Sequence, residues 1–146
     1  MRAPLLGFLL LVLTVLPAQA GAELIAAAKA GDAAGVERLL AAGADPDCPD
    51  QLRNTALIFA ARDGRLEVGR LLIAAGASVN WVDDEHVSPL ILAAFKNHPA
   101  VARLLLSAGA DTEIRDQWGR RAMDYALRRG AADEIARQLR LAGGAD

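Results

Sequence analysis

The sequence repeats with a period of 33 residues, and this period limits the folds open to it. Glycine-containing triplets recur at this interval as Gly43-Ala44-Asp45, Gly76-Ala77-Ser78 and Gly109-Ala110-Asp111. A second set has the same spacing: Thr55-Ala56-Leu57, Ser88-Pro89-Leu90 and the looser Arg121-Ala122-Met123. A period of this length indicates stacked units, none of which can bury its apolar face alone. Such arrays usually present an extended surface to a partner.

Residues 1–20 have the pattern of a secretory signal peptide. Arg2 precedes an apolar run of 12 residues, Leu5 to Leu16, and Ala18-Gln19-Ala20 is a small-x-small cleavage site. The run is shorter than the roughly 17–25 residues that span a bilayer. We therefore expect cleavage after Ala20, with an uncleaved anchor as the alternative, and a mature domain of residues 21–146.

Composition excludes several classes of partner. The chain has 16 basic and 18 acidic residues, and loss of the segment that carries Arg2 leaves a net charge of −3. General binding to nucleic acid or to an anionic membrane requires a basic excess, so we expect neither. Cys48 is the only cysteine, so an internal disulfide is impossible and the fold depends on packing.

Aligning the glycines predicts four helix–turn–helix units, at about 22–47, 48–80, 81–113 and 114–146. In the second unit we expect helices from about Ala56 to Arg62 and from Leu66 to Ala75, with Gly76 left-handed after the second. In the third unit Ser88 is suited to cap a helix that begins at Pro89. Alanines are expected where neighbouring helices approach closely, at positions 60, 61, 93 and 94.

These residues resemble the ankyrin-repeat family. The segment from Gly64 to Asn80 looks like the second half of an ankyrin repeat, and Ser88-Pro89-Leu90-Ile91-Leu92-Ala93-Ala94 looks like the Thr-Pro-Leu-His-x-Ala-Ala signature. The resemblance implies an all-α solenoid with hairpin-like loops. Two internal repeats would lie between an N-terminal and a C-terminal cap unit.

Two departures from the family pattern concern specific positions. The signature histidine is replaced by Ile58, Ile91 and Asp124. The glycine at the hairpin tip is present only as Gly119, and Arg53 and His86 take its place in the other two loops. Either those residues adopt a positive φ or the turns differ.

The residue types that carry catalysis are sparse. His86 and His98 have no metal-ligand spacing, and Cys48 and His86 fall in successive units, too far apart for a nucleophile and its base. No glycine-rich loop opens a helix, and Asp83-Asp84-Glu85 is typical of a solvated hairpin. We expect neither enzymatic activity, nor a metal, nor a cofactor.

The resemblance implies that the concave face, made by the hairpin tips and the first helices, binds a partner protein. Carried over residue by residue, the candidate binding residues are Leu52, Arg62, Asp84, Glu85, Val87, Phe95, Lys96, Trp118, Arg120, Arg128 and Arg129. Trp118 and Phe95 are large apolar groups at positions where water is expected, and interface hot spots are enriched in Trp and Arg.

Each of these readings has a structural alternative. Trp118 can fold over its own hairpin, Phe95 can fill a gap between units, and Trp81 is expected to pack at a hairpin base. Arg128 and Arg129 can simply complement a helix C-terminus. Cys48 is expected to be a half-buried apolar residue, with a mixed disulfide to a partner as the alternative.

Together these features predict an exported, periplasmic or secreted protein, monomeric by itself, that binds another protein noncovalently as an accessory or adaptor. An inhibitor or immunity protein that blocks a toxin is the first alternative, because the acidic middle hairpin suits a basic active site. An enzyme is the distant alternative.

Overall fold

The computed structural model describes residues 17–144, which form helices and no strands. The helices are α1 (Pro17–Ala30), α2 (Ala33–Ala41), α3 (Ala56–Asp63), α4 (Leu66–Ala74), α5 (Pro89–Lys96), α6 (Pro99–Ser107), α7 (Ala122–Leu127) and α8 (Glu134–Ala142). The residues of the expected signal segment up to 16 lie outside the described part, so the signal peptide stays a prediction.

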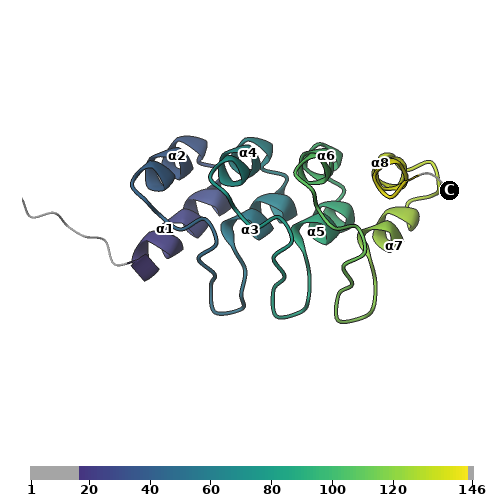
Figure 1. Cartoon of the computed structure of the whole chain (residues 1–146), viewed down its shortest axis with the longest axis horizontal. Helices are drawn as coiled ribbons and strands as arrows, with labels where there is room; N and C mark the ends of the chain where they lie inside the picture. The colour runs from purple at the N-terminus through teal and green to yellow at the C-terminus, as the bar shows by residue number, and fades with distance from the viewer. Residues whose placement is uncertain (1–16, 145–146) are drawn as a thin grey trace, which may run out of the picture.

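The helices stack as antiparallel pairs in two layers (Figure 1). The first helices of the pairs, α1, α3, α5 and α7, lie in an inner row, and the second helices form an outer row. Three loops, which we call fingers, join successive pairs and project to the same side of the inner row. The finger tips lie around residues 50–54, 83–87 and 116–120. The expected all-α solenoid is confirmed, and no helix within 17–144 is long and apolar enough to cross a membrane.

Local capping chemistry explains where the inner helices begin. The hydroxyls of Thr55 and Ser88 accept hydrogen bonds from the backbone N–H groups of Ile58, at 3.4 Å, and Ile91, at 3.2 Å. Arg121 occupies the same register and has no such acceptor. There Asp124, in the register of the missing histidine, accepts the N–H of Arg121 at 2.8 Å instead.

The close approach of the inner helices depends on alanine. Ala60, Ala61, Ala93 and Ala94 are fully buried, and α3 packs against both α1 and α5 while α5 packs against both α3 and α7. Leu57 and Leu90 fill the same layer. The small alanine side chains let neighbouring inner helices pack closely, and the inner helices line up in one row.

Successive units are also joined by hydrogen bonds at both edges. At the fingers, the N–H of Asp84 donates to the carbonyl of Leu52, and that of Gln117 donates to the carbonyl of Glu85. At the opposite ends of the inner helices, the Arg65 side chain of the second unit donates a hydrogen bond to the carbonyl of Lys29 in the first unit. His98 lies 3.0 Å from the carbonyl oxygen of Arg62 in the same way, which makes its Nε2–H the donor.

The finger tips adopt left-handed backbone conformations. Arg53 has φ of 62° and His86 has φ of 61°, close to the 74° of Gly119 at the equivalent position. The missing glycines therefore leave the turn geometry unchanged, and two non-glycine residues occupy a conformation that costs L-amino acids about 1–2 kcal/mol.

Candidate functional site

A groove of about 220 Å³ lies between the middle finger, the last finger and the two inner helices behind them. Its floor consists of Val87 and Ile91, which are buried, together with the partly exposed Leu92. Phe95 and Tyr125 come from α5 and α7, and Trp118 comes from the last finger. Residues from two fingers and two inner helices therefore meet on the concave side.

The aromatic side chains of the groove contact one another and two arginines. The rings of Phe95 and Tyr125 meet edge to face, with centroids 5.3 Å apart. The Arg120 guanidinium lies 4.8 Å from the centroid of Trp118 and 4.9 Å from that of Tyr125. Arg128 lies 5.1 Å from the Tyr125 centroid. Cation–π contacts hold these guanidinium groups against apolar surface, so one wall of the groove is both aromatic and positively charged.

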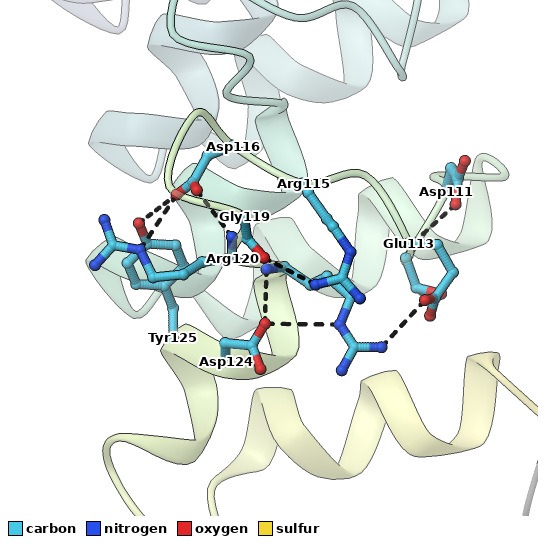
Figure 2. Close-up of polar contacts among 10 residues, drawn as sticks. Asp111, Glu113, Arg115, Asp116, Gly119, Arg120, Asp124 and Tyr125 are labelled. Carbon is cyan, nitrogen blue, oxygen red and sulfur yellow. Dashed lines mark hydrogen bonds and ion pairs between the residues drawn. The ribbon is translucent and has the colours of Figure 1, made fainter.

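Asp116 holds the last finger in place (Figure 2). Its carboxylate accepts hydrogen bonds from the N–H groups of Trp118 and Arg120, each at 2.9 Å, and from the hydroxyl of Tyr125 at 2.5 Å. Burial acts to raise the pKa of the Asp116 carboxyl, but these hydrogen bonds outweigh it and hold that pKa below its usual range. Burial and the bond to Asp116 raise the pKa of Tyr125. The pair is thus a charged carboxylate and a neutral phenol.

Six of the expected binding residues line this groove. They are Glu85, Val87, Phe95, Trp118, Arg120 and Arg128. Phe95 and Trp118 keep 50% and 57% of their surface exposed, whereas Val87 keeps only 7% and contributes to the floor. The interpretation that Trp118 folds over its own hairpin holds only in part, because its ring contacts Arg120 of the same finger but keeps more than half of its surface exposed.

Two others lie beside a second hollow. Leu52 and Asp84, with Glu85, line a space of about 230 Å³ between the first two finger tips. Leu52 is 64% exposed. This hollow is polar at its base, where Asn54 and Asp83 contribute, and Glu85 is shared with the aromatic groove.

The last three lie at the ends of inner helices. Arg62 pairs with Asp63 at 2.9 Å and stacks on Phe59, and Lys96 lies 5.1 Å from the ring centroid of Phe95. Arg129 has a structural role. Its guanidinium donates a hydrogen bond to the carbonyl of Ala94 at 2.7 Å and forms an ion pair with Asp133 at 2.8 Å. It complements the C-terminal end of α5, the structural alternative named above.

The structural role of Asp83 was missed at the sequence level. Asp83 was grouped with Asp84 and Glu85 as a solvated acidic run, but its carboxylate accepts the N–H groups of Glu85 and Val87. Asp50 and Asp116 do the same in their own fingers. The signal was available, since these three aspartates recur at the 33-residue period. On the middle finger, the carboxylates of Asp84 and Glu85 are therefore the ones available to a partner.

Tyr125 was missed for a different reason. It lies in the first helix of the last unit at a position that reads as core, and it is indeed 6% exposed. Only the three-dimensional arrangement shows that its ring forms the back of the groove. Trp81 packs as expected: its indole N–H donates to the carbonyl of Arg53 at 2.8 Å and braces the first finger.

Cys48 and the charged pair beside α8 are engaged in contacts within the fold. Cys48 is a free, partly buried thiol that packs against Gly21 of α1. No three His, Cys, Asp or Glu side chains in this range are placed to hold a metal ion. A recess of about 240 Å³ beside α8 is lined by Glu113 and Arg121, but these two side chains pair with each other at 3.1 Å.

Comparison with protein families finds a match over most of the stack. A family model described as ankyrin repeats (3 copies) matches residues 24–116, more than half of the chain. The match begins in α1 and ends at Asp116, in the last finger. None of the curated proteins matches the chain.

Proposed function

Because the chain belongs to the ankyrin-repeat family, we propose that it is an exported, noncatalytic protein that binds a partner protein in the groove between the middle and last fingers. Ankyrin repeats are protein–protein interaction modules. We choose this groove because it brings aromatic side chains and arginines together. Its lining includes Phe95, Trp118, Tyr125, Arg120 and Arg128. Aromatic and arginine side chains are the residues that most often dominate interface energies.

The size and composition of the groove favour a protein over a small ligand. Pockets for drug-sized ligands usually enclose roughly 300–1,000 Å³ and bury most of the ligand. A groove of about 220 Å³ that opens between two loops accommodates about one large side chain. The rest of a partner would then lie across the finger tips and the ends of the inner helices.

Export rests on the N-terminal segment. A basic residue, a short apolar run and the Ala18-Gln19-Ala20 site form the pattern of a cleaved signal, and we place the mature protein in the periplasm as an accessory or adaptor of an envelope protein. Expression of the full chain with a C-terminal tag tests this. The expected outcome is a periplasmic product whose N-terminal residue is Gly21, and a cytoplasmic product that retains Met1 would contradict it.

Partner capture tests the groove. We would compare the wild-type mature chain, a Phe95→Ala/Trp118→Ala variant and a Leu141→Ala control as baits for envelope extract. Leu141 is 80% exposed on α8, away from the groove, so the control also removes an exposed apolar side chain. We expect one protein to be retained by the wild type and the control and lost by the double variant. Circular dichroism confirms that all three baits are folded.

The same complex distinguishes an adaptor from an inhibitor. The free acidity of Asp84 and Glu85 beside the groove suits a basic active-site cleft, which is the observation in favour of an inhibitor or immunity protein. An inhibitor forms a tight one-to-one complex that abolishes the activity of its partner. An adaptor leaves that activity unchanged or raised.

A further inference from the structure

The groove contains guanidinium groups that no carboxylate within residues 17–144 fully neutralises. Arg128 makes neither a hydrogen bond nor an ion pair with another side chain in that range, and its guanidinium lies 5.1 Å from the centroid of the Tyr125 ring. Arg120 lies 3.6 Å from Asp116, beyond hydrogen-bond distance, and its buried Nε has no acceptor in that part of the chain. Arg103, Arg121 and Arg129, in contrast, each donate to a carboxylate at 2.8–3.1 Å.

The reason that Asp116 does not neutralise Arg120 is its own coordination. One carboxylate oxygen accepts two backbone N–H groups and the other accepts the Tyr125 hydroxyl. A carboxylate already engaged in this way has little capacity left for a bidentate bond to arginine. The guanidinium of Arg120 is therefore held in place by its two aromatic contacts and retains N–H donors for a ligand. The Arg128 guanidinium contacts the same Tyr125 ring, and both arginines line the groove.

From these contacts we infer that the groove binds a segment of the partner in which an apolar side chain adjoins an aspartate or glutamate. The apolar side chain occupies the space above Val87 and Ile91, against Phe95 and Trp118. The carboxylate is bound by Arg120 and Arg128. Arginine is suited to this because its planar fork matches a carboxylate in two parallel hydrogen bonds. This inference rests on the proposed function and adds the chemistry of the ligand.

Charge favours a carboxylate over a phosphate. Arg120 and Arg128 bring two positive charges to the lining of the groove and Glu85 brings one negative charge. Asp116, 3.6 Å from Arg120, offsets further positive charge from behind the lining. The small positive excess suits one carboxylate better than a phosphorylated side chain, which carries about −1.5 to −2 charges at pH 7. Glu85, on the finger opposite, also disfavours a second acidic group on that side and sets the orientation of the segment.

Selection of displayed peptides tests the inference. Random 12-residue peptides, fused at their C-terminal ends to a phage coat protein, offer side-chain carboxylates but no free C-terminal carboxylate. We would select them on the mature chain and measure the most enriched sequence as a labelled synthetic amide by fluorescence anisotropy. We expect enriched sequences to share a large apolar residue with Asp or Glu one or two positions away.

Variants then locate the contact. Arg128→Gln keeps a polar side chain but removes the charged guanidinium that lies over Tyr125, and we expect it to weaken binding about tenfold or more. Replacing the acidic residue of the peptide with its amide should cause a similar loss, and the two changes together should cost little more than either alone, because both remove one interaction. Arg137→Gln, an exposed arginine on α8, serves as the matched control and should bind as the wild type does.

The outcomes separate this inference from the proposed function. Enriched peptides without a carboxylate, or an amide peptide that binds as tightly as the acid, overturn the inference while groove binding stands. Peptides that bind the Phe95→Ala/Trp118→Ala variant as tightly as the wild type overturn the groove itself. Selection of no peptide at all overturns both.

Discussion

At the scale of single residues, Asp116 supports more of the site than Asp50 or Asp83, although the three share one register. All three accept two N–H groups of their own finger, but Asp116 alone is buried at 5% exposure and also binds Tyr125. The aspartate at the equivalent position of the middle finger is partly exposed, so water can replace its carboxylate. The third finger thus depends on one side chain for its position beside the groove.

We predict that Asp116→Ala destabilises the protein by about 2–4 kcal/mol, since each orphaned buried donor costs about 1–3 kcal/mol and some are rescued by water. The matched change Asp83→Ala should cost about 1 kcal/mol or less, because its carboxylate is partly exposed and water can replace it. Urea unfolding of both variants measures the difference. Equal losses of unfolding free energy in the two variants would show that burial of Asp116 does not add to its contribution to stability.

The depressed pKa of Asp116 predicts an acid dependence of stability. A carboxyl whose pKa is lower in the folded state stabilises the fold fully above its unfolded value, about 3.9, and this contribution is lost as pH falls through the native pKa. Asp116→Asn retains an acceptor for the backbone donors but cannot titrate. Between pH 5 and pH 2.5 its free energy of unfolding should therefore fall less steeply than that of the wild type. If the free energies of unfolding of the two proteins fall in parallel with pH, other carboxyls cause the loss of stability in acid.

The finger tips allow a test of backbone strain at equivalent positions. His86 has φ of 61° and an exposed side chain, so His86→Gly should stabilise the protein by about 0.3–1 kcal/mol. Gly119→Ala should do the reverse by about 1 kcal/mol; at φ of 74° a Cβ there meets no atom within 4 Å, which leaves backbone strain as the cause. Melting temperatures that move in the same direction would show that φ does not govern these sites.

At the scale of helices, the limits of the elements were predictable because their causes are local. The expected helices at Ala56–Arg62 and Leu66–Ala75 differ by one residue from α3 and α4, and Ser88 and Pro89 mark the start of α5 as expected. Tyr125 and Asp116 could not be assigned to a site in the same way. Their contact joins a finger to a helix, and only the packed stack places it beside Phe95.

The close packing of the inner helices predicts that a larger side chain in this row lowers the stability of the protein. Ala93 has no exposed surface where α5 packs between α3 and α7, so Ala93→Leu should overpack this layer and cost about 1–3 kcal/mol. Ala100→Leu makes the same change at an exposed position of α6 and should be nearly neutral. A melting temperature for Ala93→Leu equal to that of Ala100→Leu would contradict the packing of the row.

At the scale of the whole molecule, stacking of the units brings together residues that are far apart in the sequence and form a site only in the folded chain. Phe95 and Trp118 belong to different units, as do Glu85 and Arg128, and each alone is an ordinary surface residue. The uniform inner row brings the fingers side by side, and the backbone bond from Gln117 to Glu85 fixes the spacing of the two that border the groove. The middle finger and the last unit consequently act as one surface, with acidic groups on one side and arginines on the other.

Removal of the expected signal segment tests how far the stack extends at its other end. In α1 the residues before the cleavage site are exposed or partly exposed, whereas Gly21, Leu24 and Ile25 are buried and pack against the second unit. A chain that begins at Gly21 should therefore lose about 1 kcal/mol or less of stability, chiefly because its charged amine faces the helix dipole. Leu24→Ala in that chain should cost about 2–5 kcal/mol. A truncated chain as unstable as Leu24→Ala would make residues 1–20 part of the fold, which is incompatible with a cleaved signal.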